Sequence, residues 1–292
     1  MKLALGTVQF GMDYGVSNNL GKTSNEEVVN ILAEAGKSNI TLIDTAALYG
    51  DSEKVLGKTI SDSSLFNIVT KSPVYHGKII TKRDVDLLTD VFKKSLELLN
   101  CENVYGLLIH HAADLFAPGG ESLIEAMSEL KSQGLVHKIG VSLYDGQTID
   151  RVLELFTPDI VQLPINIADQ RLIVSGNLEK LKNYGVEIHA RSLFLQGLLL
   201  MNISDISEHF NPIKYYFENL EQFSINSGMS RLEMCLDFGS SCKEIDRLVV
   251  GVTNADELKE LVEVTRRIDN NKYDYSSLSL VEEEYLDPSK WK

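Results

Sequence analysis

The sequence contains few cysteines, and their spacing does not pair them. Only Cys101, Cys235 and Cys242 occur among the 292 residues, and none belongs to a Cys-x-x-Cys pair. An odd number of isolated cysteines provides no disulfide framework. A reducing compartment is the simplest interpretation, so we expect a cytoplasmic protein.

Long apolar segments and an excess of positive charge are also missing. No apolar run approaches the ~20 residues that span a bilayer, and Met1–Gly6 reaches a glycine too early for a signal peptide. The net charge is -14, with 28 Lys and Arg against 42 Asp and Glu. Nucleic acids and anionic membranes attract clustered positive charge. We therefore expect neither as a partner, while a local basic pocket for a phosphorylated ligand is not excluded.

Glycine-rich nucleotide loops are absent from the sequence as well. No G-x-G-x-x-G follows the first apolar segment, which argues against an open doubly wound sheet. Between Gly15 and Gly21 lie five residues, where a phosphate loop needs four. We expect this segment to lead into the first helix, with Thr23 or Ser24 as its cap.

Short apolar segments alternate with amphipathic stretches along the whole chain. The predicted strands are Leu3–Leu5, Thr41–Ile43, Ile68–Thr70, Val104–Ile109, Lys138–Val141, Ile160–Leu163, Val186–Ile188 and Leu248–Gly251. Between them apolar residues follow helical spacing, as in Val85, Leu88, Phe92, Leu96 and Leu99. Such alternation predicts parallel strands, and eight units in one domain (1–292) predict a closed (β/α)8 TIM barrel. Phe194–Ser227 breaks the spacing, so we expect a long loop and an extra helix there.

Polar residues and glycines follow the predicted strands, at the end of the barrel where active sites lie. They are Gly6, Thr7, Gln9, Asp44, Lys71, His110, Ser142, Gln162, Asn166, Arg191, Ser192, Gly251 and Thr253. Singly, each has an ordinary explanation: Asp44 can cap a helix, Lys71 can be solvated, and His110 can sit in the core. Together they indicate a functional ring, because a purely structural barrel has no reason to place polar groups there.

Tyr49 lies five residues after Asp44 and completes a group suited to carbonyl chemistry. Reducing a carbonyl requires a proton donor for the developing alkoxide, and tyrosine is a weak acid with a reference pKa of about 10. A neighbouring ammonium favours the phenolate, so Lys71 would assist Tyr49 while Asp44 holds the lysine. His110 would donate a hydrogen bond to the carbonyl oxygen. The hydride must come from a cofactor, because no side chain can supply one.

Five segments resemble the aldo-keto reductase family, and together they span nearly the whole chain. Ile43–Glu53, with the sequence IDTAALYGDSE, is similar to the family's D-T-A-x-x-Y-G-x-S-E segment. The others are Val69–Lys71, Leu107–His110, Lys138–Ser142 and Gln162–Asn166. The chain is thereby identified as a short bacterial member. The resemblance implies NADPH-dependent reduction of a small aldehyde or ketone, or the reverse oxidation.

The resemblance also implies a role for each rim residue. Tyr49 is expected to be the general acid/base, Lys71 and Asp44 its tuners, and His110 the residue that positions the substrate. The predicted cofactor contacts of the first, fifth and sixth strands are Gly6, Thr7, Ser142 and Gln162, of which the last two would touch the nicotinamide carboxamide.

The loop after the seventh strand resembles the family's diphosphate loop, Y-S-P-L-x-x-G-L. Its predicted cofactor contacts are Arg191, Ser192, Leu193, Gln196 and Gly197. Arg191 replaces the aromatic residue that stacks on nicotinamide. A planar guanidinium can also stack on a ring, so Arg191 either keeps that role or binds an acidic substrate. Leu143 replaces an asparagine after the fifth strand, which removes one amide contact.

The segment after the eighth strand resembles the family's adenosine-phosphate site. Its predicted contacts are Gly251, Thr253, Asn254 and Glu257. Many members hold the 2′-phosphate with Lys and Arg, where this chain has Gly251 and Glu257. A carboxylate repels a phosphate but accepts from a ribose hydroxyl, which favours NAD. Alternatively, Glu257 points to solvent while Thr253 and Asn254 bind the phosphate, so the cofactor prediction is NADP or NAD.

Other functional classes compete with a reductase. Some family members act mainly as cofactor-binding regulatory subunits, which turnover of an aldehyde panel would distinguish. A metal-dependent barrel hydrolase would need an H-x-H motif or several strand-end carboxylates; His110 and His111 are adjacent, so we predict no metal site. The tail Leu286–Trp291 resembles bacterial members associated with surface-sugar biosynthesis and suggests a sugar or nucleotide-sugar substrate. No oligomeric state follows from these patterns.

Overall fold

The computed structural model describes residues 2–18, 20–75, 77–268 and 273–291. Parallel strands close into one barrel in the order of the sequence, and β8 pairs back onto β1. The strands are β1 (Leu3–Gly6), β2 (Leu42–Asp44), β3 (Asn67–Lys71), β4 (Val104–Ile109), β5 (Val136–Ser142), β6 (Ile160–Pro164), β7 (Glu187–Arg191) and β8 (Arg247–Gly251). The predicted (β/α)8 barrel is confirmed, and each predicted strand overlaps an observed one.

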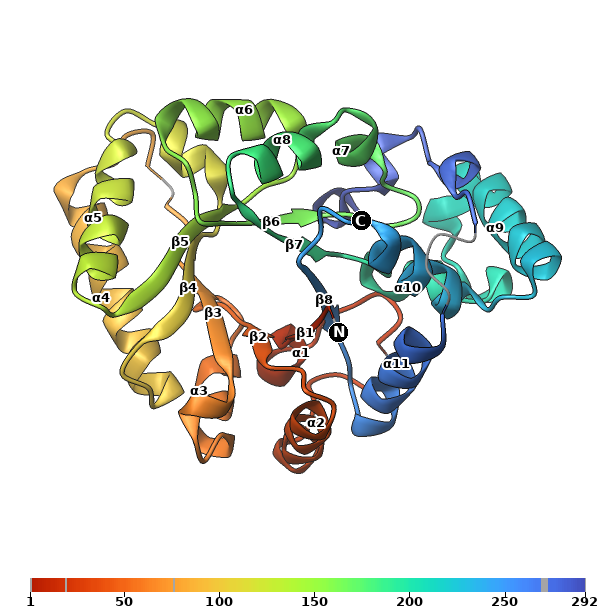
Figure 1. The fold of residues 1–292 in the computed structure, drawn as a ribbon, viewed down its shortest axis with the longest axis horizontal. Coiled ribbons are helices and arrows are strands. Elements are labelled where there is room, and N and C mark those ends of the chain that lie inside the picture. Colours follow the sequence, from red (N-terminus) through yellow and green to blue (C-terminus); the bar gives the residue numbers. More distant parts are fainter. Residues whose placement is uncertain (1, 19, 76, 269–272, 292) are drawn as a thin grey trace.

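Helices surround the barrel on its outer side (Figure 1). The ring consists of α2 (Asn25–Lys37), α3 (Ser52–Thr59), α4 (Lys82–Leu99), α5 (Glu121–Ser132), α6 (Gly146–Leu155), α8 (Asn177–Asn183), α10 (Arg231–Ser241) and α11 (Ala255–Arg267). Two single-turn helices, α1 (Val8–Gly11) and α7 (Arg171–Val174), lie in loops. Short 3-10 helices are η1 (Ser63–Leu65), η2 (Ala112–Phe116), η3 (Leu195–Leu200), η4 (Ile203–Asp205), η5 (Glu208–Ile213), η6 (Ser276–Leu278), η7 (Glu283–Tyr285) and η8 (Pro288–Lys290).

Local sequence signals explain where the ring helices begin and end. In α4 the stripe formed by Leu88, Phe92 and Leu99 is buried against the barrel. The helix ends at Asn100, whose φ of 52° is left-handed. Ser24, not Thr23, caps α2, and its side chain accepts a hydrogen bond from the Glu27 amide. The loop at Gly15–Gly21 therefore leads into a helix, as predicted.

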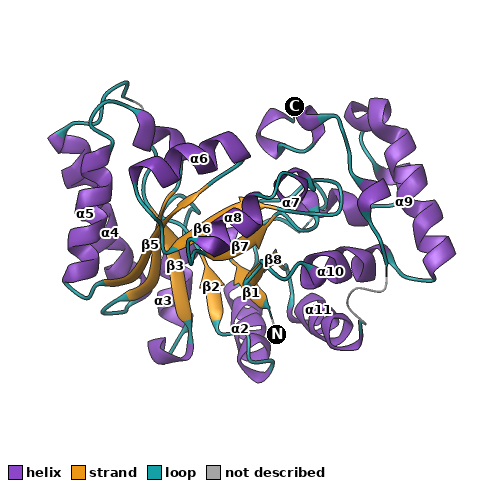
Figure 2. Ribbon diagram, turned by 45° about the horizontal axis from the view of Figure 1, so that its top comes forward, coloured by secondary structure: helices purple, strands orange, loops and turns teal. Residues whose placement is uncertain are grey.

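The segment between β7 and β8 carries the predicted extra helix. It contains η3, η4 and η5 and then α9 (Lys214–Ser227), which stands beyond α10 at the edge of the ring (Figure 2). The C-terminal tail packs on this addition. The Trp291 ring meets the Phe210 ring edge-on, with centroids 5.0 Å apart. Trp291 thus anchors the tail on the segment between β7 and β8, and it does not line the cavity described below.

The barrel interior is a packed core rather than a channel. An apolar layer fills it with side chains from alternate positions of the strands: Ala4, Leu42, Val69, Leu108, Ile160 and Val249. Gly106 faces the same layer, where an added Cβ would lie 3.1 Å from the Ile160 Cδ1 atom. The layer separates the polar residues at the two barrel ends.

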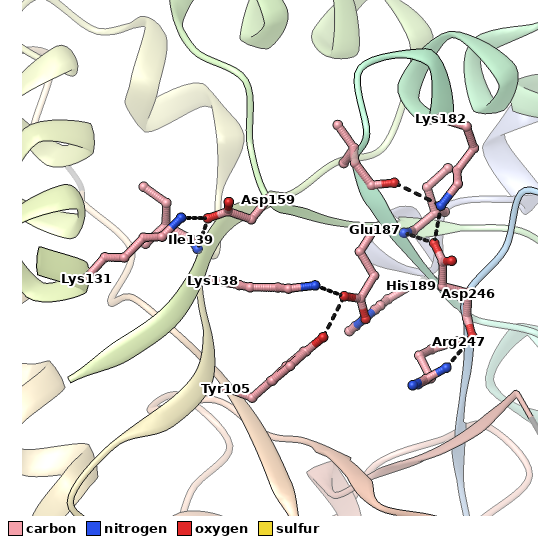
Figure 3. A network of polar contacts seen from close by, with 12 residues as sticks. Tyr105, Lys131, Lys138, Ile139, Asp159, Lys182, Glu187, His189, Asp246 and Arg247 are labelled. Carbon is pink, nitrogen blue, oxygen red and sulfur yellow. Dashed lines mark hydrogen bonds and ion pairs between the residues drawn. The ribbon is translucent and has the colours of Figure 1, made fainter. Parts of the chain in front are cut away.

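A polar network closes the N-terminal end of the barrel (Figure 3). The Glu187 carboxylate accepts hydrogen bonds from Lys138, from the Tyr105 hydroxyl at 2.6 Å and from the His189 Nε2 atom at 2.8 Å. Burial would raise the pKa of Glu187, but these hydrogen bonds, foremost that of His189, hold it well below its usual range. Two further ion pairs connect helices to the loops before the next strands: Lys131 of α5 pairs with Asp159 before β6, and Lys182 of α8 pairs with Asp246 before β8. Polar residues at this end of such a barrel serve stability rather than chemistry.

Candidate active site

The C-terminal ends of the strands surround a cavity of about 680 Å³. It is lined by most of the residues singled out from the sequence: Gly6, Thr7, Gln9, Asp44, Tyr49, Lys71, His110, Ser142, Gln162, Arg191, Ser192, Leu193, Gln196, Gly197, Gly251, Thr253 and Glu257. Asn166 and Asn254 do not line it. Asn166 is buried beyond the end of β6, and its side chain donates to the Ser192 carbonyl, so it supports the loop after β7.

An ion pair between Asp44 and Lys71 lines the cavity. The Lys71 Nζ atom lies 2.8 and 2.9 Å from the two carboxylate oxygens and 2.9 Å from the Thr45 carbonyl. Burial opposes the lysine charge, but Asp44 outweighs it and raises the pKa of Lys71. Gln162 donates to the same carboxylate at 2.7 Å. Asp44 is therefore engaged with Lys71 and Gln162 rather than capping a helix.

Tyr49 and His110 meet next to this ion pair. The Tyr49 hydroxyl lies 3.4 Å from the Lys71 Nζ atom. The Tyr49 and His110 rings lie edge to face, with centroids 6.0 Å apart. The backbone amide of His110 donates to the Ser72 hydroxyl at 3.1 Å, which fixes the end of β4. The four residues predicted as a group from the sequence thus come together in space.

His110 is neutral at physiological pH. Burial, followed by the charge of Lys71, lowers its pKa to about 4 against the opposing effect of Asp44, and Arg191 contributes in the same direction. The ring therefore carries a single N–H and can donate one hydrogen bond. Its Nδ1 atom is buried and has no hydrogen-bond partner among the described residues.

Residues that sequence reasoning missed hold the Tyr49 segment in place. The Ser52 hydroxyl donates to the Thr7 carbonyl at 2.9 Å, and Thr7 in turn donates to the Asp44 carbonyl. Gly11 touches the Tyr49 backbone so closely that an added Cβ would lie 1.6 Å from the Tyr49 carbonyl oxygen. Ser52 belongs to the Ile43–Glu53 motif, so its place in the motif was the available signal for it.

The loop after β7 has a backbone suited to an anion. Left-handed φ angles occur at Ser192 (61°), Gln196 (55°) and Gly197 (89°). The amide N–H groups of Leu193 and Phe194 have no hydrogen-bond acceptor within the described ranges. Free N–H groups in such a turn form a concave anion site, which fits the diphosphate expected here.

A second loop closes against the β7 loop from across the cavity. The Gln196 side chain donates to the Tyr14 hydroxyl at 3.2 Å. Ser17 lies so close to Gly197 that an added Cβ would be 1.8 Å from the Ser17 Oγ atom. The segment after β1 therefore helps to shape the cavity, which its position in the sequence alone does not reveal.

The N-terminus of α11 is occupied by one of its own carboxylates. Glu257 accepts hydrogen bonds from the Thr253 amide at 2.7 Å, the Thr253 hydroxyl at 2.8 Å and the Asn254 side chain at 3.1 Å. Glu257 is exposed, and its carboxylate is engaged with Thr253 and Asn254. Asn254 itself caps the helix through the Glu257 amide.

Comparison with known proteins assigns the family. The model of the aldo/keto reductase family matches residues 2–281. The chain belongs to this family. Its members are generally NAD(P)H-dependent carbonyl reductases that act on small molecules.

Individual relatives are distant. An aldo-keto reductase of Mycolicibacterium vanbaalenii is 31% identical over 193 residues, which are 63% of this chain and 64% of that protein. The NADH-specific methylglyoxal reductase of Escherichia coli is 25% identical over 207 residues, 63% of this chain and 61% of that protein. This chain spans less than two thirds of the length of either relative. A solved aldo-keto reductase of Bacillus halodurans, in its holo form, has the same fold with a TM-score of 0.76 and 18% identity, covering 97% of this chain and 95% of that one.

Features typical of two other classes of protein are absent from the described ranges. No helix within them is both long and apolar enough to cross a membrane. Within the same ranges, His, Cys, Asp and Glu side chains form no cluster that would bind a metal ion.

Proposed function

We propose that this protein reduces an aldehyde or ketone to the alcohol, with a reduced nicotinamide cofactor as hydride donor and Tyr49 as general acid. The observation that carries the proposal is the Lys71 ammonium, which binds both Asp44 oxygens and lies 3.4 Å from the Tyr49 hydroxyl. An ammonium in this position stabilises the phenolate that Tyr49 becomes after donating its proton.

Tyr49 and solvent supply the proton that the reduction consumes. A bound nicotinamide cofactor would supply the hydride for the carbonyl carbon. Tyr49 donates its hydroxyl proton to the carbonyl oxygen, and Lys71 stabilises the resulting phenolate. The neutral His110 ring donates a hydrogen bond to the same oxygen and orients the carbonyl. A proton from solvent then restores Tyr49.

The cavity provides groups that would hold a dinucleotide. The free amides of Leu193 and Phe194 suit the diphosphate. Ser142 at the end of β5 and Gln162 within β6 both line the cavity, where they would bind the carboxamide. Gln9 lies beside Gly251, and its buried Oε1 atom has no partner within the described ranges. The predicted contacts Gly6, Thr7 and Gly251 line the same cavity.

We infer that NAD is preferred over NADP. Glu257 and Glu260 line the end of the cavity at α11, and their negative charges oppose a 2′-phosphate. Glu257 also occupies the Thr253 and Asn254 donors that would otherwise bind it. The related Escherichia coli reductase is NADH-specific by name, which is consistent with this preference.

Two further proposals concern the substrate class and an alternative function. We retain a sugar or nucleotide-sugar carbonyl as the proposed substrate, on the resemblance of the C-terminal tail. A cofactor-binding regulatory subunit is the second candidate, because the same residues would bind cofactor without turnover.

Replacing Tyr49 with phenylalanine tests the proposed chemistry. Carbonyl reduction across a panel of aldehydes and aldoses should fall by at least about 100-fold, the scale of general acid catalysis, while NADH binding stays near wild type. Tyr184→Phe, at an exposed tyrosine on the turn before β7, is the matched control. Undiminished turnover in Tyr49→Phe would refute the mechanism, and cofactor binding without any turnover in the wild type would favour the regulatory subunit.

Fluorescence titration with NADH and NADPH tests the cofactor preference. NADH should bind more tightly than NADPH. The variant Glu257→Gln, which removes the charge but keeps the shape of the side chain, should reduce the difference between the two affinities. Asp256→Asn removes a charge from the same helical turn at an exposed position that does not line the cavity. Much tighter binding of NADPH to the wild type would overturn the inference.

A further inference from the structure

Arg191 carries a positive charge into the catalytic cavity without a matching carboxylate. Its guanidinium makes two long hydrogen bonds, 3.4 Å to the Leu143 carbonyl and 3.3 Å to the Ser192 hydroxyl. In the described part of the chain no carboxylate forms an ion pair with it. A guanidinium has five N–H donors in a planar fork, so most of its capacity is unused.

An aromatic ring holds the guanidinium in place. The Arg191 Cζ atom lies 4.3 Å from the centroid of Tyr144, a half-exposed residue on the loop after β5. A cation over an aromatic face is attracted by the ring, and stacking fixes the plane of the fork. Tyr14 approaches from the opposite loop, where it interacts electrostatically with Arg191, Tyr49 and Tyr144. Tyr144 and Tyr14 thus both interact with this cation.

The charges of the cavity are separated along its length. At the catalytic end Asp44 neutralises Lys71, so the charge of Arg191 remains in excess. This charge acts on the catalytic group, because it helps to disfavour the protonated form of His110. At the other end Glu257 and Glu260 are negative. In a chain with a net charge of -14, the end beside Tyr49 is a local site for an anion.

We propose that Arg191, held by Tyr144, determines specificity by binding an anionic group of the carbonyl substrate, a carboxylate or a phosphate. The bidentate fork of arginine matches both groups. The tyrosines offer flat apolar faces to the remainder of such a substrate. This inference rests on the proposed reductase function and names the substrate class of that site.

The competing roles for Arg191 concern the cofactor. A guanidinium that stacked on the nicotinamide, or that bound the diphosphate, would contribute to NADH affinity. A guanidinium that binds the substrate would contribute to the preference for charged over neutral carbonyl compounds. Cofactor affinity and substrate preference therefore distinguish the two roles in the same variant.

Matched substrate pairs test the proposal. One pair is 4-carboxybenzaldehyde and methyl 4-formylbenzoate, and the other is glyceraldehyde 3-phosphate and glyceraldehyde. The wild type should prefer the charged member of at least one pair, and the pair that responds identifies carboxylate or phosphate. Arg191→Gln should reduce the ratio of kcat/KM for charged over neutral substrate by about tenfold to a hundredfold, the scale of a charged hydrogen bond. Arg191→Lys should retain part of the preference.

A control variant and a binding measurement distinguish a loss of substrate preference from a loss of cofactor affinity or of turnover. Arg83→Gln removes the same charge from an exposed position on α4 and should leave the ratio unaltered. Equal losses on both members of a pair, no preference in the wild type, or a loss of NADH affinity as large as the loss of preference would overturn the proposal. If no carbonyl compound is reduced, the proposed function fails. Calorimetric binding of 4-carboxybenzyl alcohol against its methyl ester then decides the anion site independently of turnover.

Discussion

Replacing Lys71 with methionine should destabilise the protein through a charge left behind in the barrel. The Lys71 and Asp44 side chains are 1% and 5% exposed, so neither charge is well solvated. Methionine keeps the apolar length of lysine but removes all four hydrogen bonds of the ammonium, to the two Asp44 oxygens, the Thr45 carbonyl and the Tyr49 hydroxyl. The Asp44 carboxylate then retains the Gln162 hydrogen bond of 2.7 Å. Removing one partner of a buried pair costs about 3–5 kcal/mol, and we expect a loss of that size.

The double variant Asp44→Asn with Lys71→Met separates charge from packing. It leaves no charge at this site, and the asparagine oxygen can still accept from Gln162. Neutral groups of similar volume often replace a buried ion pair at little cost. The double variant should therefore lie within about 1 kcal/mol of the wild type, although it should be inactive.

Urea unfolding followed by circular dichroism measures these differences at pH 7. The midpoint should fall in Lys71→Met and largely recover in the double variant. Lys93→Met, at an exposed lysine of α4, controls for the substitution itself. A single variant as stable as the wild type, or a double variant no more stable than the single one, would refute the reasoning that the unpaired carboxylate causes the loss.

Two further predictions concern His110 and Gly197. An NMR titration should show that His110 is protonated with a pKa of about 4. Because this pKa lies below the unfolded value of about 6.5, the neutral ring contributes its full stability above pH 6.5, and this contribution is lost as the pH falls towards 4. The variant His110→Asn should not show this loss of stability. A midpoint near 6.5 would contradict this. Gly197→Ala should weaken NADH binding in a fluorescence titration, because its Cβ would lie 1.8 Å from the Ser17 Oγ atom at a φ of 89°. Gly228→Ala, at a φ of 70° in open space, should cost only about 1–2 kcal/mol of stability and spare binding; equal effects on binding would count against the loop contact.

Local patterns in the sequence determined the barrel and its catalytic end. The buried stripe of α4 and the cap at Asn100 depend on neighbours a few residues away, so periodicity and residue type were enough to predict them. The rim follows from the same logic, because a polar residue at the end of a parallel strand must face the catalytic end. Lys71 and His110 were found in this way, and the motif around Tyr49 supported them.

Contacts between distant segments were decided by the tertiary structure alone. Gln162 binds Asp44 across 118 positions of the sequence, and Arg191 stacks on Tyr144 rather than pairing with a carboxylate. The contact of the exposed Glu257 carboxylate with the Thr253 amide was likewise not predicted from the sequence. Sequence patterns specify which face of an element is buried, but the partner of a polar side chain depends on which donors the closed barrel leaves within about 3 Å. That choice is made only when all strands have closed into the barrel.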